Sequence, residues 1–155
     1  MPLLRAALSW NFVLATAVCA SLLAQLIKVL LNLFIFHRFI AERMWGAGGM
    51  PSSHSATVCA MVVATGRYCG VSSPTFAIAA VLSIIVMYDA MGVRYETGEQ
   101  AKVLNRLFTE WMDQGIEQFQ FPHGKKLKEM VGHTPIEVLT GAALGIVLGF
   151  AMPMV

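Results

Sequence analysis

The stretch that decides the fold is FAIAAVLSIIVMYDAM, residues Phe76–Met91, which carries no charged side chain before Asp89. An apolar run of this length is long enough to cross the hydrocarbon core of a bilayer. The whole chain has the same character, because 57% of its 155 residues are hydrophobic, only 13% are charged and the mean hydropathy is +0.66. A soluble domain usually carries about 25% charged residues. The sequence therefore predicts an integral membrane protein.

Apolar segments on both sides of this run complete a set of four predicted membrane-spanning helices. We expect them at about residues 9–36, 54–69, 74–92 and 135–155, in a single membrane domain of residues 1–155. The first segment is long enough to be tilted or broken, so a fifth membrane segment stays open. The predicted fold class is all-α, an integral membrane helical bundle.

The segment 93–132 has a different pattern, because its apolar side chains recur at helical spacing and its charged side chains occupy the other face. This pattern predicts an amphipathic helix lying in the membrane interface. An ordinary soluble helix in a loop domain is the alternative. The apolar face carries Val103, Leu104, Leu107, Phe108, Met112 and the expected anchor Trp111, and the other face carries Lys102, Arg106, Glu110 and Asp113.

Basic side chains gather on one side of this predicted topology. Four crossings place the loops 36–50 and 93–132 on the same side, with eight Lys and Arg residues against two on the other. The positive-inside rule then predicts that both loops face the cytoplasm at a bacterial inner membrane, or the stroma at a plastid membrane. The net charge of +2 is too small to indicate nucleic-acid binding. The eight are Arg38, Arg43, Arg94, Lys102, Arg106, Lys125, Lys126 and Lys128, and the two are Arg5 and Arg67.

The same topology brings ionisable residues to one membrane face. His54 opens the second span and His133 opens the fourth, while Lys28 lies about two turns before the end of the first. Asp89 and Arg94 close the third span at this face. Ionisable groups in or beside a span are costly, so they usually face a partner or a water-filled cavity. We therefore expect a functional site at this face.

The turn GGMPSSHS, residues 48–55, leads into the second span and includes Gly49. Backbone N–H groups in such a turn, together with the helix dipole, suit a bound phosphate. The hydroxyls of Ser52 and Ser53 add further donors. A simple helix cap formed by Pro51 and the serines is the alternative interpretation.

A second motif, GHTPIE at residues 132–137, opens the fourth span. Thr134 and Glu137 fit a capping box, and Pro135 fits the first helical position. Glu137 also follows His133 by four residues, so one helical turn would let its carboxylate accept a hydrogen bond from the ring. Such a bond would leave the other ring nitrogen nucleophilic. Both roles of Glu137 stay open from the sequence.

Three glycines, Gly141, Gly145 and Gly149, repeat every four residues along the fourth span. Small residues at this spacing let another helix approach closely. The neighbour is either a helix of the same chain or one from a second copy, which would make a homo-oligomer.

The motifs together resemble the type-2 phosphatidic acid phosphatase and vanadium haloperoxidase superfamily, and in particular its small divergent branch in bacteria and plastids. The resemblance is carried by the blocks GGMPSSHSA at 48–56, MYDAMGVR at 87–94 and GHTPIEV at 132–138. Two arginines of the superfamily pattern are missing, because Ile35 and Leu127 stand in their places. Ser53 replaces a glycine, and Glu137 replaces an aspartate.

The resemblance implies a lipid-phosphate phosphatase that needs no metal or cofactor, acting from the cytoplasmic or stromal face. His133 would attack the phosphorus, His54 would protonate the leaving alkoxide and then activate water, and Glu137 would orient His133. A substrate such as phosphatidylglycerophosphate fits this arrangement. The alternatives are a non-catalytic protein that binds phosphate head groups and a small transporter or channel subunit. The implied phosphate-binding residues are Lys28, Ser52, Ser53 and Arg94, supported by Asp89, Gly49 and Gly132.

Overall fold

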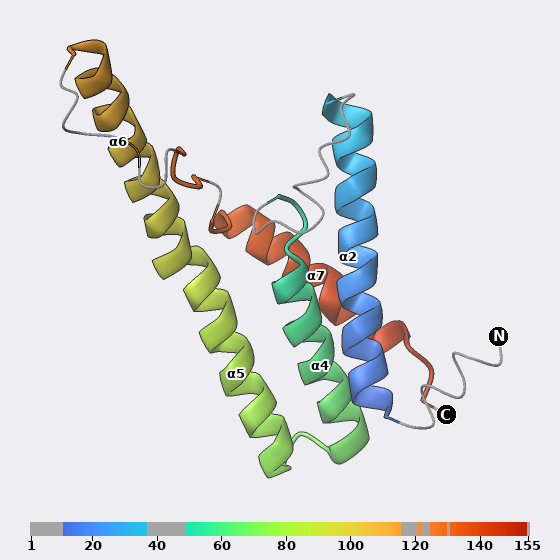
Figure 1. Ribbon diagram of the computed structural model, residues 1–155. Helices are drawn as coiled ribbons and strands as arrows, with labels where there is room; N and C mark the ends of the chain where they lie inside the picture. Colours follow the sequence, from blue (N-terminus) through green and yellow to red (C-terminus); the bar gives the residue numbers. More distant parts are fainter. Residues whose placement is uncertain (1–10, 37–48, 116–120, 122–124, 130, 155) are drawn as a thin grey trace.

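The computed structural model describes residues 11–36, 49–115, 121, 125–129 and 131–154. Within these ranges the chain forms α-helices and no strand, so the predicted all-α class is confirmed for the part described (Figure 1). Most of the loop 36–50, on which part of the charge argument rests, lies outside the described residues. The helices are α2 (Phe12–Phe36), α4 (Ser53–Cys69), α5 (Pro74–Met91), α6 (Val93–Asp113) and α7 (Pro135–Ala151).

Two of the described helical stretches are long and apolar enough to cross a membrane. They are Phe12–Phe34 in α2 and Pro74–Asp113, whose apolar part is α5. Their outward side chains are large and apolar, for example Leu22 on α2 and Ile84 on α5, each 64% exposed. α4 and α7 have 17 residues each, at the short end of the about 17–25 residues that a span needs. The predicted membrane character thus rests in the structure on α2 and α5.

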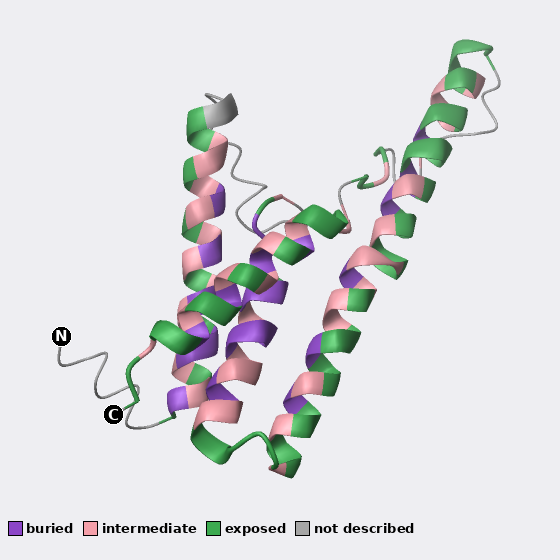
Figure 2. Cartoon of the chain, turned by 180° about the vertical axis from the view of Figure 1, so that it is seen from behind, coloured by how far each residue is buried: buried purple, intermediate pink, exposed green. Residues whose placement is uncertain are grey.

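The helix α4 is the centre of the bundle and packs against α2, α5 and α7. Its contact with α2 is made by small residues, with Ala20 and Ala24 of α2 against Ala56 and Ala60 of α4. Figure 2 shows the buried residues gathered where α2, α4 and α7 meet, whereas much of the outer surface of α5 and α6 is exposed. Small side chains bring these helix axes close together, which lets polar residues at the helix ends converge.

The glycines of α7 face α4 of the same chain. A Cβ atom at Gly141 would collide with the carbonyl oxygen of Ser52, and one at Gly145 with that of Ala56. At Gly149 it would come within 2.7 Å of the Cβ of Val63. The helix that approaches the three glycines is therefore α4 of the same chain. It occupies the face of α7 that a second copy would otherwise contact.

The far end of the bundle is tied together by Arg67 of α4. Its Nη1 donates to the carbonyl oxygens of Gly149 and Met152 at 2.6 and 2.8 Å, where α7 ends. The guanidinium also lies 5.5 Å from the ring centroid of Phe12 in α2. A cation at a helix C-terminus satisfies carbonyl groups that lack intrahelical partners. Arg67 thus joins three helices at the end of α4 opposite to His54.

The predicted amphipathic helix is present as α6, and it continues the direction of α5 beyond the rest of the bundle (Figure 1). Gly92 separates the two helices without turning the chain back. At about 1.5 Å per residue, the 40-residue stretch Pro74–Asp113 is about 60 Å long, twice the thickness of a hydrocarbon core. The placement of α6 in the membrane interface stays a prediction.

Candidate functional site

The two histidines singled out in the sequence lie next to each other. The ring centroids of His54 and His133 are 5.9 Å apart and the ring planes meet at 80°. His54 is in the first turn of α4, and His133 immediately precedes the cap of α7. The close packing of α4 on α7 therefore brings both helix starts, and both rings, to one place.

A cavity of about 270 Å³ opens beside these rings. Its polar wall is formed by His54, His133, Asp89 and Arg94. The rest of its lining is apolar and comes from Ile85, Val86 and Ala90 of α5. The cavity thus joins a polar end containing two imidazoles to the side of an exposed apolar helix.

The start of α4 is fixed by Ser52, which is fully buried. Its Oγ accepts hydrogen bonds from the backbone N–H and the hydroxyl of Ser55, at 3.3 and 3.1 Å. Its own N–H donates to the carbonyl oxygen of Glu137 at 3.0 Å, which ties the turn to α7. The helix-cap interpretation is therefore correct for the Ser52 side chain, and the neighbouring Ser53 hydroxyl accepts from Nε2 of Gln25 at 3.3 Å.

Lys28 is buried beneath this turn, with only 1% of its surface exposed. Its Nζ has no hydrogen-bond partner among the residues that the structure describes. The aliphatic stem of Lys28 lies against Gly49, where a Cβ atom would stand 3.5 Å from Lys28 Cδ. Gly49 has φ of +87°, a conformation that glycine adopts without strain. An unpaired buried ammonium is costly, so this position is suited to receive an anion.

The carboxylate of Glu137 connects the two motifs through backbone groups. Its Oε2 accepts from the N–H of Thr134 at 2.9 Å, which completes the predicted capping box. Its Oε1 accepts from the N–H of Gly49 at 3.2 Å. The hydrogen bond predicted between Glu137 and the His133 ring is not formed. Both carboxylate oxygens are taken by main-chain donors instead, so Glu137 positions the two loops and not the imidazole.

His133 is the most enclosed group of the site, with 1% of its surface exposed. Within the described ranges neither of its ring nitrogens has a hydrogen-bond partner. Burial lowers the pKa of His133 below the ordinary histidine value; nearby Glu137 opposes this, and the positive charges of Lys28 and Arg94 reinforce it. The ring is consequently neutral near pH 7, with a lone pair on one nitrogen.

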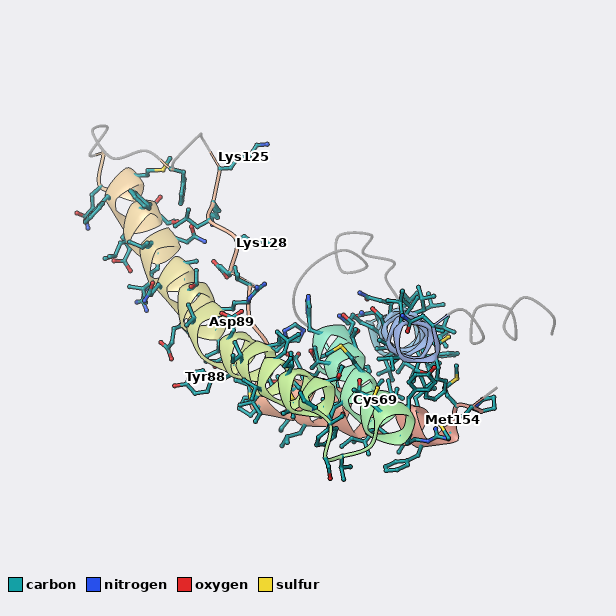
Figure 3. All side chains as sticks on the ribbon, turned by 90° about the horizontal axis from the view of Figure 1, so that it is seen from below. Cys69, Tyr88, Asp89, Lys125, Lys128 and Met154 are labelled. Atoms are coloured by element: carbon teal, nitrogen blue, oxygen red, sulfur yellow. The ribbon has the colours of Figure 1, made fainter. Side chains whose placement is uncertain are left out.

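Asp89 and Arg94 form an ion pair at the mouth of the cavity, between Oδ2 and Nε. Figure 3 marks Asp89 near the end of α5, where that helix meets α6. Both side chains are partly exposed, 39% for Asp89 and 52% for Arg94. The pair keeps a guanidinium beside the histidines.

Two polar residues that hold parts of the site in place, Gln25 and Asn105, were not singled out from the sequence. Gln25 lies three residues before Lys28 on α2 and contacts Ser53, so helical spacing from Lys28 was the signal that could have found it. Asn105 lies in α6 and holds the segment that leads to His133. Among the described residues, no group of three or more His, Cys, Asp or Glu side chains is arranged to hold a metal ion.

Comparison with known proteins agrees with this arrangement of motifs. Residues 9–148 match the family described as the Divergent PAP2 family. A relative in Bacillus subtilis (strain 168), described as the uncharacterized membrane protein YuiD, is 40% identical over 144 residues, covering 89% of this chain and 91% of that protein. No solved structure matches the chain. Because this match covers nearly its whole length, the chain belongs to the Divergent PAP2 family.

Proposed function

We propose that the protein is a membrane lipid phosphatase that hydrolyses a phosphomonoester through a phosphohistidine intermediate on His133. The observation that carries the proposal is the pair of imidazoles 5.9 Å apart on one cavity, beside a buried ammonium without a partner. One imidazole serves as nucleophile and the other as proton carrier, and the ammonium offers a charge for phosphate.

In the first step a ring nitrogen of His133 attacks the phosphorus of the lipid phosphate. The new N–P bond forms as the bond between phosphorus and the leaving alkoxide oxygen breaks. His54 donates its proton to that oxygen, which leaves as the lipid alcohol. The neutral state of His133 supplies the lone pair for this attack. His54 lines the cavity and is partly exposed, so it exchanges protons with water.

In the second step water hydrolyses the phosphohistidine. His54, now without its proton, removes a proton from water while the oxygen attacks phosphorus, and the N–P bond breaks. Inorganic phosphate leaves and His133 returns to its starting state. Lys28, Arg94 and the N-terminus of α4, with its helix dipole, stabilise the negative charge of the phosphoryl oxygens in both steps. Glu137 supports the geometry by holding Gly49 and Thr134.

The membrane arrangement that goes with this mechanism has four spans, with α4 and α7 as the two short ones. The site then lies at the cytoplasmic face of a bacterial inner membrane or the stromal face of a plastid membrane. The apolar cavity wall of Ile85 and Val86 belongs to α5, whose outer side is exposed and apolar. A lipid in that leaflet thus has its phosphate at the level of the histidines. Phosphatidylglycerophosphate carries a phosphomonoester of the kind that this reaction would hydrolyse.

The test is phosphate release from lipid phosphates by purified protein in nanodiscs containing a metal chelator. We expect turnover with the wild type, inhibition by vanadate, and loss of activity in His133→Ala. Acid-labile, alkali-stable phosphate should be trapped on His133 in the wild type. Cys69→Ser, at the opposite end of α4, is the matched control and should keep wild-type activity. Full activity in His133→Ala would refute the mechanism.

A second candidate is a membrane protein that binds phosphate head groups without turnover. The absence of the two arginines of the superfamily pattern favours this candidate. Leu127 stands at one of these two positions, and Asn105 of α6 binds its backbone. Wild-type protein that binds a lipid phosphate in competition with vanadate, yet releases no phosphate, would support this candidate over the phosphatase.

A further inference from the structure

The return segment, defined here as residues 125–129 and 131–134, leads from α6 back to His133 and α7. Figure 3 shows it running beside α6 from Lys125 past Lys128. Its described residues form neither helix nor strand, so their backbone N–H and C=O groups need partners elsewhere. Whatever holds this segment also decides where His133 lies.

The side chain of Asn105 in α6 supplies these partners for Leu127. Its Nδ2 donates to the carbonyl oxygen of Leu127 at 2.9 Å, and its Oδ1 accepts from the N–H of the same residue at 2.8 Å. Nδ2 also donates to Oε1 of Glu129 at 2.8 Å. Asn105 is buried, with 4% of its surface exposed. One carboxamide thus binds both backbone groups of Leu127 and the side chain two residues later.

Glycines allow the same segment to approach α5 and α6 at backbone distance. A Cβ atom at Gly98, two turns before Asn105, would collide with the carbonyl oxygen of Glu129. A Cβ atom at Gly132 would collide with the backbone of Tyr95. Contacts thus pass from Asn105 toward the start of α6 as the return segment proceeds. They end where the N–H of His133 donates to the carbonyl oxygen of Ala90 in α5, at 3.1 Å.

The ring of His133 has no described hydrogen bond of its own, so its place follows from the main chain that carries it. Asn105 is absent from the cavity lining and lies about 16 Å along α6 from Arg94, at about 1.5 Å per residue. It therefore does not touch a substrate in this site. Its influence on chemistry must pass through Leu127, Glu129 and the return segment.

We propose that Asn105 is a positioning residue for His133, fixing the return segment on α6 so that the nucleophile faces His54. The proposal rests on the proposed function for its catalytic consequence. It assigns α6 a role in the reaction although α6 extends away from the bundle. Only a carboxamide fits, because alanine removes all three hydrogen bonds and aspartate loses the donors to Leu127 and Glu129.

The first experiment compares steady-state kinetics of Asn105→Ala with those of wild-type protein in nanodiscs. A displacement of His133 by about 1 Å should lower kcat by about 100-fold. KM should stay within a few-fold of the wild type, because the phosphate-binding groups are not moved. Lys102→Ala, an exposed residue of α6 whose ammonium forms an ion pair with Glu99, is the matched control and should leave kcat unchanged. Wild-type kcat in Asn105→Ala would overturn the proposal.

A second variant keeps the test valid if Asn105→Ala folds poorly. Asn105→Asp sets two carboxylates against each other, and adding Glu129→Gln restores an amide donor between the two positions. We expect the double variant to recover several-fold in kcat over Asn105→Asp alone, and Glu129→Gln alone to remain close to wild type. A double variant no more active than Asn105→Asp contradicts the proposed route through Glu129.

A third measurement needs no enzyme activity and therefore separates this proposal from the proposed function. Diethyl pyrocarbonate modification is followed by mass spectrometry at His133, with His54 as internal reference, and amide exchange is followed at Leu127. In Asn105→Ala both should become several-fold faster than in wild type and in Lys102→Ala. If wild type releases no phosphate but these rates rise, the phosphatase fails and the positioning role stands. Unchanged rates at both sites overturn the positioning role.

Discussion

The buried ammonium of Lys28 makes a prediction that links stability to anion binding. Lys28→Met removes the charge and keeps a long side chain against Gly49. Lys28 is 1% exposed and its Nζ has no hydrogen-bond partner among the described residues, so without a bound anion its ammonium is buried with only the more distant charge of Glu137 to oppose the cost. The variant should therefore be more stable than the wild type in the absence of ligand, and less able to bind phosphate or vanadate.

The size of both effects can be worked out. Replacing buried ion pairs by apolar groups of similar volume stabilises proteins by up to about 1–4 kcal/mol, and we apply the same range to the single ammonium of Lys28. For a chain of this size that corresponds to a rise in Tm of at least about 2–4 °C per kcal/mol. Vanadate at 100 times its Kd stabilises the wild type by about 2.7 kcal/mol. If Lys28 contributes about 10- to 100-fold in affinity, the variant gains only about 0.4–1.4 kcal/mol at that concentration.

The assay is thermal unfolding in one detergent at one scan rate, with and without vanadate. Wild type should shift by about 5–10 °C with vanadate. Lys28→Met should start at a higher Tm and shift by about half as much or less. Leu26→Met, on the exposed side of α2, is the matched control and should behave as wild type. A variant that is no more stable without vanadate and is protected as strongly as wild type would refute an anion-binding role for Lys28.

Two further predictions concern the helix contact and the nucleophile. Gly145→Leu places a side chain against the backbone of Ala56, so the free energy of unfolding should fall by about 2–3 kcal/mol in a thermal assay. Ala143→Leu, on the exposed side of α7, is the control and should change it little. Because burial lowers the pKa of His133, the neutral ring persists as the pH falls below about 6.5, and phosphoenzyme formation should decline only at more acidic pH. The prediction is wrong if, as the pH is lowered, the single-turnover rate has already fallen to about half its maximum at pH 6.5 or above. His133→Ala gives the background rate of phosphate release.

The elements that the sequence predicts correctly are those encoded locally. Long, mostly apolar runs predicted α2 and α5, and the capping box of Thr134 and Glu137 correctly predicted the start of α7. The pairing of His54 with His133 was also predictable, because two helix starts at one end of a bundle have few places to lie. Each of these features depends on nearby residues or on simple topology.

Features that depend on contacts between distant segments could not be predicted. Asn105 looks like an ordinary polar residue of an amphipathic helix, and its partners in the return segment follow it by more than 20 residues. Glu137 had two locally reasonable roles, and only the fold shows that its carboxylate accepts from the N–H groups of Gly49 and Thr134. Nothing in the sequence around Gly92 says whether α6 turns back or continues α5.

The glycine contact between α4 and α7 has a consequence for how this protein can diversify. Gly141 and Gly145 of α7 meet the backbone of Ser52 and Ala56, so at these positions no side chain separates the two helices that begin at the imidazoles. The distance between these two helix starts therefore does not depend on the side-chain conformation of residues between them. The cavity wall of Ile85 and Val86, in contrast, belongs to α5 and is free to change. Selectivity for different lipids can therefore evolve through substitutions on α5 while the spacing of α4 and α7 stays the same.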